Sequence, residues 1–352
     1  QDLGSACSCR HSSNPARYRC PECFVGPLLC HQCIVQSHRH LPFHRTEVWN
    51  GKFFAAVPLA TLGSIVSLHS GHGLCPERPK AWDPQNLTVI DVNGVHDIKF
   101  CFCYCRTRLP ILQQLLYAKL WPATISSPST AFTFAALDDY HHHTLTSRKS
   151  AHDYWQTLCR KTSNGFPDRI SSYYQHLLRV SREYRYIRTL ERSGQAFDMD
   201  VHLHTSRRPG LMAMPCFACP EPDFNMDPAW RTNTPKELSY VNRLHLSQDA
   251  NFRNQLRQKK KRDPEDVSLF DGRAYYRPEQ EFQAYLAAAV DSDQVSYSSC
   301  PSKSECSNHK AVLTQNVLKF KYMLIAGIMA VVCRHDCFRP GAQNDLKLGE
   351  KY

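Results

Sequence analysis

The segment from residue 7 to residue 44 restricts the fold of this chain more than any other, because it concentrates cysteine and histidine. Its cysteines form three pairs and its last histidines follow them: Cys7, Cys9, Cys20, Cys23, Cys30, Cys33, His38, His40 and His44. A segment this short buries too little apolar surface to fold by itself. Metal can supply the missing stability, since a structural zinc ion contributes roughly 10–16 kcal/mol to the folding of a small domain.

The order of the cysteine pairs predicts two zinc sites that interlock as a cross-brace. Zinc takes four thiolate or imidazole ligands in a tetrahedron, and a C-x2-C turn offers two of them. The first and third pairs would hold one ion, and the second pair with two histidines would hold the other: Cys7, Cys9, Cys30, Cys33, and Cys20, Cys23, His38, His44. This is the ligand order of a B-box-like finger. His40 could replace either histidine, and His11 and His31 are nearer alternatives.

Disulfide bonds are the alternative use of these cysteines, as in a secreted domain stapled by cross-links. The histidines that close the cluster favour zinc instead. The whole chain contains 17 cysteines, an odd number, and most stand in C-x-C or C-x2-C pairs. No basic-then-apolar leader opens the sequence. We therefore expect a reducing, intracellular compartment in which the cysteines serve as metal thiolates.

Length and charge set the broad class of the protein. A chain of 352 residues is long enough for two or three domains. The most apolar segment, residues 322–333, is shorter than the roughly 18 residues that a membrane helix needs, so it predicts a buried strand or two and no membrane partner. The net charge of +11 favours a polyanionic partner, above all nucleic acid, although a solvated basic surface would carry the same charge.

Residues 86–105 predict a β-hairpin followed by helical segments. Asn93-Gly94 is the dipeptide favoured in a type I′ turn, in which both central residues need positive φ. The return strand would end in Cys101, Cys103 and Cys105, which alternate and would therefore share one face. Residues 131–137 then predict a strand, and helices are expected from Pro110, over 150–161, where Ser150 begins a capping box, and over 169–192.

Two basic stretches are candidates for contact with nucleic acid. The helix expected over 169–192 has a row of arginines opposite its apolar stripe, and Arg179 and Arg182 belong to that row. The second stretch is the run Lys259, Lys260, Lys261 and Arg262. Phosphate contacts would explain both. A solvated surface is the commoner explanation of such charge patterns.

A third C-x2-C pair, Cys216-x2-Cys219, lies between prolines and is typical of a zinc knuckle. No partner pair lies near it in sequence. The candidates to complete a third site are therefore distant: Cys75 with His72 in the turn that begins at His69, His96, and the group Cys101, Cys103 and Cys105. Buried cysteines without metal are the alternative. We take Cys75, Cys103, Cys105, Cys216 and Cys219 as ligands, which makes two or three structural zinc ions in all.

Several motifs recur along the chain in one order: HRTEVWNGKFF (44–54), GHGLCP (71–76), VIDVNGVHDIKFCFCYC (89–105), QQLLYAKLWPAT (113–124), AFTFAALDDYHHHTLTSRKSAHDYW (131–155) and MPCFACP (214–220). Together they resemble the CxC-like cysteine-cluster region of KDZ (Kyakuja–Dileera–Zisupton) transposases, familiar from fungal mobile elements. DANF (249–252) resembles the start of the KDZ catalytic core, an RNase H-like fold. CRHDCFRPGAQNDLKLGEKY (333–352) resembles a later part of that start.

The resemblance implies an α+β protein in three parts. A B-box-like zinc cross-brace would occupy residues 1–54, and a cysteine-cluster region with a hairpin and helices would occupy 55–230. Residues 231–352 would form the incomplete first part of an RNase H-like α/β core.

The resemblance also implies a DDE-type DNA transposase. In such an enzyme, acidic residues hold two Mg²⁺ or Mn²⁺ ions that activate water or a 3′-hydroxyl for attack on phosphate. Asp249 would be the first of these acids, although the strand before it is unusually polar and the chain ends before the later acids. We therefore expect a fragment or decayed copy without nuclease activity.

The implied partner is DNA, at transposon ends or in chromatin, in the nucleus. A protein-interaction scaffold built on the B-box-like module is the alternative, since such modules more often contact proteins than bases. A fragment of an active transposase is a second alternative.

Overall fold

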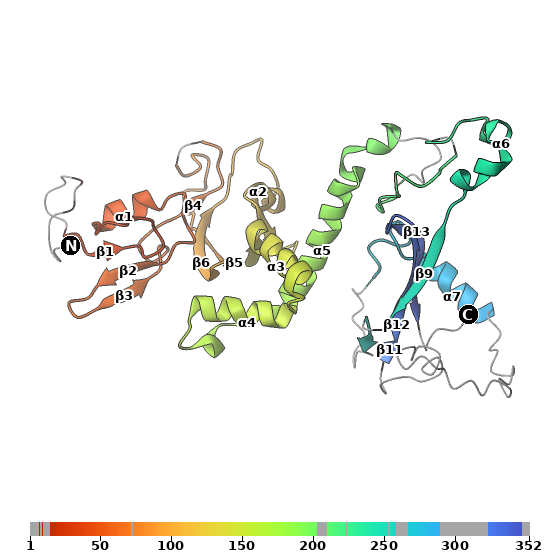
Figure 1. Cartoon of the computed structure of the whole chain (residues 1–352). Helices are drawn as coiled ribbons and strands as arrows, with labels where there is room; N and C mark the ends of the chain where they lie inside the picture. The colour runs from red at the N-terminus through yellow and green to blue at the C-terminus, as the bar shows by residue number, and fades with distance from the viewer. Residues whose placement is uncertain are drawn as a thin grey trace, which may run out of the picture. The chain divides into compact units, whose positions relative to one another are not determined.

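The computed structural model describes residues 7, 9, 15–71, 73–202, 210–222, 224–252, 254–257, 267–288 and 323–346. The chain divides into two compact units, Gln1–Arg185 and Tyr186–Tyr352 (Figure 1). Helices and antiparallel or mixed sheets occur in both, so the predicted α+β class is confirmed. Among the described residues, no helix is both long and apolar enough to cross a membrane.

The first unit begins with a small finger, which we define as the described residues between Cys7 and Val57. Its elements are β1 (Tyr18–Arg19), α1 (His31–Ser37), β2 (Thr46–Trp49) and β3 (Phe54–Val57). The strands form an antiparallel sheet in the order β1-β2-β3. The buried cluster beside this sheet consists of Cys7, Ala16 and Cys30. Two of these three are predicted metal ligands, so the finger has little apolar core apart from its cysteines.

A five-stranded sheet follows the finger in the same unit. Its strands are β4 (Val66–Ser67), β5 (Gln85–Asp91), β6 (Gly94–Cys101), β7 (Leu120–Pro122) and β8 (Thr130–Thr133), in the order β4-β6-β5-β8-β7. The predicted hairpin is β5–β6, and β5 also pairs in parallel with β8. Helix α2 (Ile111–Tyr117) lies between β6 and β7 in sequence and buries Leu115 against Val89, Phe100 and their neighbours.

The hairpin turn lies one residue earlier than predicted. Asp91 pairs with Gly94, so the loop residues are Val92 and Asn93. Gly94 has a φ of 129°, whereas neither loop residue has a positive φ. The turn is therefore not of type I′, because that type requires positive φ at both central residues. Gly94 alone supplies the unusual backbone conformation, which suits glycine since it has no Cβ.

The return strand ends at Cys101, so the prediction that Cys101, Cys103 and Cys105 share one strand face is wrong. Cys101 is buried in the sheet, whereas the other two lie in the loop after it. The loop leaves the sheet because the backbone N–H and carbonyl of Cys103 form hydrogen bonds with the Gln114 side chain instead of with a neighbouring strand. Its Oε1 accepts from the Cys103 N–H at 2.8 Å, and its Nε2 donates to the Cys103 carbonyl at 3.2 Å.

Three longer helices complete the first unit: α3 (Phe134–Ser147), α4 (Ala151–Thr162) and α5 (Tyr174–Arg192), whose last residues belong to the second unit. The predicted strand over 131–137 stops at Thr133, because that side chain caps α3 by accepting from the Ala136 N–H. Ser150 caps α4 as predicted, by accepting from the Asp153 N–H. The short 3-10 helix η1 (Pro167–Arg169) precedes α5, which therefore begins later than predicted.

The second unit is built around a three-stranded antiparallel sheet. Its strands are β9 (Leu246–Asn251), β12 (Gly327–Cys333) and β13 (Phe338–Leu346), in the order β13-β12-β9. The apolar segment predicted to form strands does so, as β11 (Met323–Ile325), which pairs with β10 (Leu256–Arg257), and β12. The helices are α6 (Trp230–Asn233), α7 (Glu279–Ala288), η2 (Gln195–Phe197), η3 (Met199–His202) and η4 (Lys236–Asn242).

Candidate metal centres

Four groups of cysteine and histidine converge in the described residues, each with its ligand atoms within 4.8 Å of one another. Zinc lies about 2.3 Å from sulfur and about 2.0–2.1 Å from nitrogen. At tetrahedral angles these bond lengths separate two sulfurs by about 3.8 Å and a sulfur from a nitrogen by about 3.5 Å. These two values test whether a group fits a zinc ion.

The first group consists of Cys7, Cys9, Cys30 and Cys33, and it joins the start of the chain to the first turn of α1. The Sγ atoms of Cys9 and Cys30 are 3.9 Å apart, which fits the edge of a zinc tetrahedron. A disulfide bond would need about 2.05 Å. The described cysteines are free thiols, which argues against the disulfide alternative.

The second group consists of Cys20, Cys23, His38 and His44. The Cys23 Sγ lies 3.3 Å from His38 Nε2 and 3.4 Å from His44 Nδ1, and the Cys20 Sγ lies 3.5 Å from the latter. His38 is buried, and its Nδ1 lies 2.8 Å from the Ile34 carbonyl. A donor to that carbonyl fixes the tautomer that leaves Nε2 free to bind metal.

The structure thus brings together the two interleaved ligand sets that the cross-brace prediction requires. The alternative histidines do not join them. His40 is exposed, and the His31 ring packs edge-on against Tyr18 at 5.8 Å. His11 lies outside the described residues.

The third group consists of His69, Cys75, Cys103 and Cys105. The Sγ atoms of Cys75 and Cys105 are 3.8 Å apart, and His69 Nδ1 lies 3.5 Å from the sulfur of Cys103. The loop after β6, which Gln114 holds away from the sheet, therefore brings the C-x-C pair to the turn that contains His69. His96 is not part of this group, and His72 lies outside the described residues.

The fourth group corrects the prediction for Cys216 and Cys219, which do not complete the site of Cys75. Their partners are Cys333, the last residue of β12, and His335, in the turn between β12 and β13. His335 Nδ1 lies 3.6 Å from the Cys216 sulfur and 3.5 Å from the Cys219 sulfur, across 119 and 116 residues of sequence. The signal that could have identified them is the C-x-H spacing of 333–335 at the end of an apolar strand.

The thiol pKa values show that these groups suit a cation. Hydrogen bonds from the backbone N–H groups of Cys9 and Cys30 lower the pKa of the Cys7 thiol to about 6. In the same group, the neighbouring sulfurs of Cys30 and Cys9 raise the pKa of Cys33 to about 12. The negative charge of one thiolate in the group thus makes it harder for a neighbouring thiol to lose its proton. A divalent cation would remove this opposition, because zinc binds thiolates. The residues present therefore fit zinc.

Asp249, the predicted catalytic acid, lies on the exposed face of β9, where it pairs with Ala330 of β12. Its Oδ1 accepts from the N–H of Ala250 at 2.8 Å. Within the described ranges, no group of three or more candidate metal ligands includes Asp249. Asp345 of β13 lies on the same face of the sheet as Asp249. Asn251 shares the face of Asp249, because the two are two residues apart on β9, and Asn251, Ile328 and Asp345 are register partners. Asp345 lies two strands and two residues of register away from Asp249, and no group of candidate metal ligands in the described residues contains either of them.

The predicted arginine face of α5 makes contacts within the chain. Arg179 forms an ion pair with Glu183 at 3.0 Å, and Arg188 forms one with Glu191. Arg185 donates to the Thr144 hydroxyl. Arg182 is half-buried. The run Lys259, Lys260, Lys261 and Arg262 lies outside the described residues, so a role of either stretch in DNA binding stays a prediction.

The fold and these groups define a class: an α+β protein whose cysteine- and histidine-rich regions can bind several metal ions. Residues 59–165 match the family model described as "CxC2 like cysteine cluster associated with KDZ transposases". Residues 242–352 match the Kyakuja-Dileera-Zisupton transposase. The chain belongs to the KDZ transposase family. No curated protein and no solved structure matches it.

Proposed function

We propose that this chain is a DNA-binding member of its family in which zinc stabilises cysteine-rich regions of both units. The observation that carries the proposal is the spacing of the four ligand groups. In each group the ligand atoms lie within 4.8 Å of one another, and the closest pairs, at 3.3–3.9 Å, are near the edge lengths of a zinc tetrahedron. Each group supplies four protein ligands, which leaves no position for water. Sites of this kind are structural rather than catalytic.

The proposed partner is DNA, at transposon ends or in chromatin, and the proposed location is the nucleus. Membership of a transposase family and a net charge of +11 support both. A basic chain attracts the phosphate backbone whatever the sequence, so base readout would add specificity to an electrostatic affinity.

A protein-interaction scaffold is the second candidate, and the tip of the finger favours it. Phe24 and Val25, which follow Cys23, are 98% and 82% exposed. Val25 has a φ of 53°, a conformation that β-branched residues rarely adopt. Two adjacent and exposed apolar side chains at the tip of a turn offer a surface for a protein contact.

For the second unit we propose an RNase H-like core with Asp249 as its first metal-binding acid. The position of Asp249 on a strand of an antiparallel sheet supports this assignment. The chemistry that Mg²⁺ or Mn²⁺ supplies in such a core is the activation of water or a 3′-hydroxyl toward phosphate, and it needs further acids beside Asp249.

Elemental analysis of the purified full chain tests the zinc proposal. We expect about four zinc ions per chain, and the loss of about one in a Cys20→Ser variant. A metal-free chain with its cysteines oxidised in pairs would contradict the proposal.

Retention of the zinc-loaded chain on DNA at increasing salt separates the two candidate functions. Phosphate contacts predict an affinity that falls steeply with salt, whatever the DNA sequence. A Phe24→Ala variant should bind DNA normally if the tip contacts proteins. DNA affinity that is absent even at low salt would favour the scaffold.

A further inference from the structure

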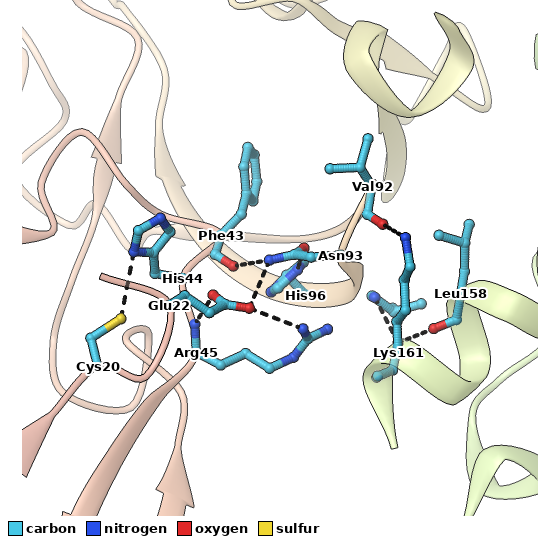
Figure 2. Close-up of polar contacts among 12 residues, drawn as sticks. Cys20, Glu22, Phe43, His44, Arg45, Val92, Asn93, His96, Leu158 and Lys161 are labelled. Carbon is cyan, nitrogen blue, oxygen red and sulfur yellow. Dashed lines mark hydrogen bonds and ion pairs between the residues drawn. The ribbon is translucent and has the colours of Figure 1, made fainter. Parts of the chain in front are cut away.

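The second metal group, Cys20, Cys23, His38 and His44, lies against the turn of the β5–β6 hairpin (Figure 2). The contact begins at Glu22, which stands between the two cysteines of the knuckle. Its carboxylate accepts from the backbone N–H of Arg45 at 2.7 Å and from Asn93 Nδ2 at 3.1 Å. Glu22 thus links the knuckle both to the residue after His44 and to a turn 71 residues away.

Asn93 reaches the other flank of the same metal group. Its Nδ2 also donates to the carbonyl of Phe43, the residue before His44, at 2.9 Å. Its Oδ1 lies 2.6 Å from His96 Nε2. A side-chain amide has two N–H donors and one carbonyl acceptor. The contacts with Glu22, Phe43 and His96 therefore use all three functions of this side chain, and two of them hold backbone or side chain adjacent to metal ligands.

Helix α4 holds the hairpin turn from the other side. Lys161 Nζ donates to the Val92 carbonyl at 2.7 Å (Figure 2). The Thr162 hydroxyl accepts from the Val95 N–H at 2.9 Å. Gly94 fits between these contacts because it lacks a side chain. A Cβ at this position would lie 2.5 Å from Arg45 Nη2 and 3.1 Å from the Thr162 backbone nitrogen. The hairpin turn therefore makes hydrogen bonds with the finger on one side and with α4 on the other.

We propose that Asn93 is a positioning residue for the second metal group, so that metal binding in the finger and docking of the finger onto the hairpin are one coupled event. This inference rests on the proposed zinc in that group. Groups that orient metal ligands typically change metal affinity by 10–100-fold when they are removed. Asn93 acts through Glu22 and Phe43, which flank Cys23 and His44 in sequence.

Thermodynamic linkage makes the coupling reciprocal. If the docked turn strengthens metal binding by some factor, bound metal must strengthen docking by the same factor. Loss of the metal by chelation would then release the finger from the five-stranded sheet. The finger would be oriented by the sheet only while its second metal group is intact.

The forward test measures metal retention site by site in the full zinc-loaded chain. A chelator and a thiol-alkylating reagent are added together, and labelling of each cysteine is followed by peptide mass spectrometry. In an Asn93→Ala variant we expect Cys20 and Cys23 to be labelled about tenfold faster than in the parent chain. Cys30 and Cys33 of the first group should keep their rates.

Two further variants keep this test falsifiable. Asn86→Ala changes an exposed asparagine on β5 of the same hairpin and should leave all rates unchanged. Asn93→Asp keeps the side-chain shape and the acceptor toward His96 but loses both N–H donors, so it should act like Asn93→Ala even if the alanine variant folds poorly. Unchanged labelling of Cys20 and Cys23 in both Asn93 variants, or an equal rise at every cysteine, would overturn the coupling.

The reverse test removes the metal group and observes the turn. In a Cys23→Ser variant we expect faster amide hydrogen exchange at Val95, whose N–H bonds to Thr162, while a Cys33→Ser variant should change it less. Equal exchange at Val95 in the parent chain and in Cys23→Ser would overturn the inference. A parent chain that contains no zinc would instead refute the proposed function, so the two failures are distinguishable.

Discussion

The finger and the five-stranded sheet are neighbours in one unit, yet different forces hold them. The sheet and its helices bury large apolar side chains completely, among them Val89, Phe132 and Leu158. The buried cluster of the finger is Cys7, Ala16 and Cys30. Burial of a large apolar side chain contributes roughly 1.5–3 kcal/mol, so the sheet can be stable through its core alone. The finger depends on metal, which makes its stability conditional on the chemistry around it.

Removal of metal is the largest perturbation that this comparison predicts. A strong chelator should unfold the finger, because each structural zinc contributes roughly 10–16 kcal/mol at neutral pH. Amide exchange should rise throughout β1, α1 and β2 while the core amides of β5 and β6 stay protected. Returning zinc should restore protection. If the sheet lost protection together with the finger, the two regions would share one source of stability and the comparison would fail.

A core substitution should give the opposite pattern. Leu158→Ala removes a side chain that is completely buried in the cluster beneath the sheet, and such changes cost about 2–5 kcal/mol. We expect a lower midpoint of thermal unfolding with an unchanged zinc content at low temperature. Leu145→Ala on α3 is a matched control, because that leucine is 67% exposed and should alter the midpoint little. Zinc loss at low temperature from the Leu158 variant would show that the metal groups need the apolar core.

The fourth group extends the comparison to ligands that are distant in sequence. Cys216 and His335 are 119 residues apart, so a metal between them closes a loop far longer than any in the finger. In the cross-link model, a loop of about 100 residues restricts the unfolded chain by about 4.7 kcal/mol and one of 15 residues by about 3 kcal/mol. Cys219→Ser should therefore loosen the turn between β12 and β13.

Hydrogen exchange at the Cys333 amide, which donates to the Cys337 carbonyl, measures that effect. Cys20→Ser is the control, because it removes a ligand in the other unit and should leave this amide protected. Protection that persists in Cys219→Ser would mean that the strands hold the turn without metal.

These differences also explain how much the sequence could predict. The two groups of the finger follow from C-x2-C spacing and ligand order, because their members are local. Cys333 and His335 could not be assigned to Cys216 and Cys219, since nothing in the intervening sequence specifies that approach. The loop position of Cys103 depends on Gln114. Helix α3, which the sequence pattern did not predict, begins where Thr133 caps it. Both are contacts that a periodic pattern does not encode.

Gly94→Ala should have a moderate effect and should act at the junction of the two regions. A side chain at this position meets Arg45 Nη2 at 2.5 Å and must adopt a φ of 129°, so a cost of about 1–3 kcal/mol is expected. The thermal midpoint should fall, with the largest rise in exchange at the turn. Gly165→Ala is the matched control, because a Cβ there would have nothing within 4 Å. Equal midpoints of thermal unfolding for the two variants would indicate that the finger does not pack against the hairpin turn at Gly94.

Loss of the cap on α4 should have the smallest effect, because it removes only the two exposed hydrogen bonds between Ser150 and Asp153 and leaves the apolar face intact. The Ser150 hydroxyl accepts from the Asp153 N–H at 3.1 Å, and its replacement by alanine should cost about 0.5–2 kcal/mol. Denaturant unfolding followed by far-UV circular dichroism measures this difference. Since Thr162, at the far end of the same helix, bonds to the hairpin turn, fraying at Ser150 should leave labelling of Cys20 and Cys23 unchanged. Faster labelling would mean that the contact of α4 with the hairpin depends on the whole helix and not only on its C-terminal residues.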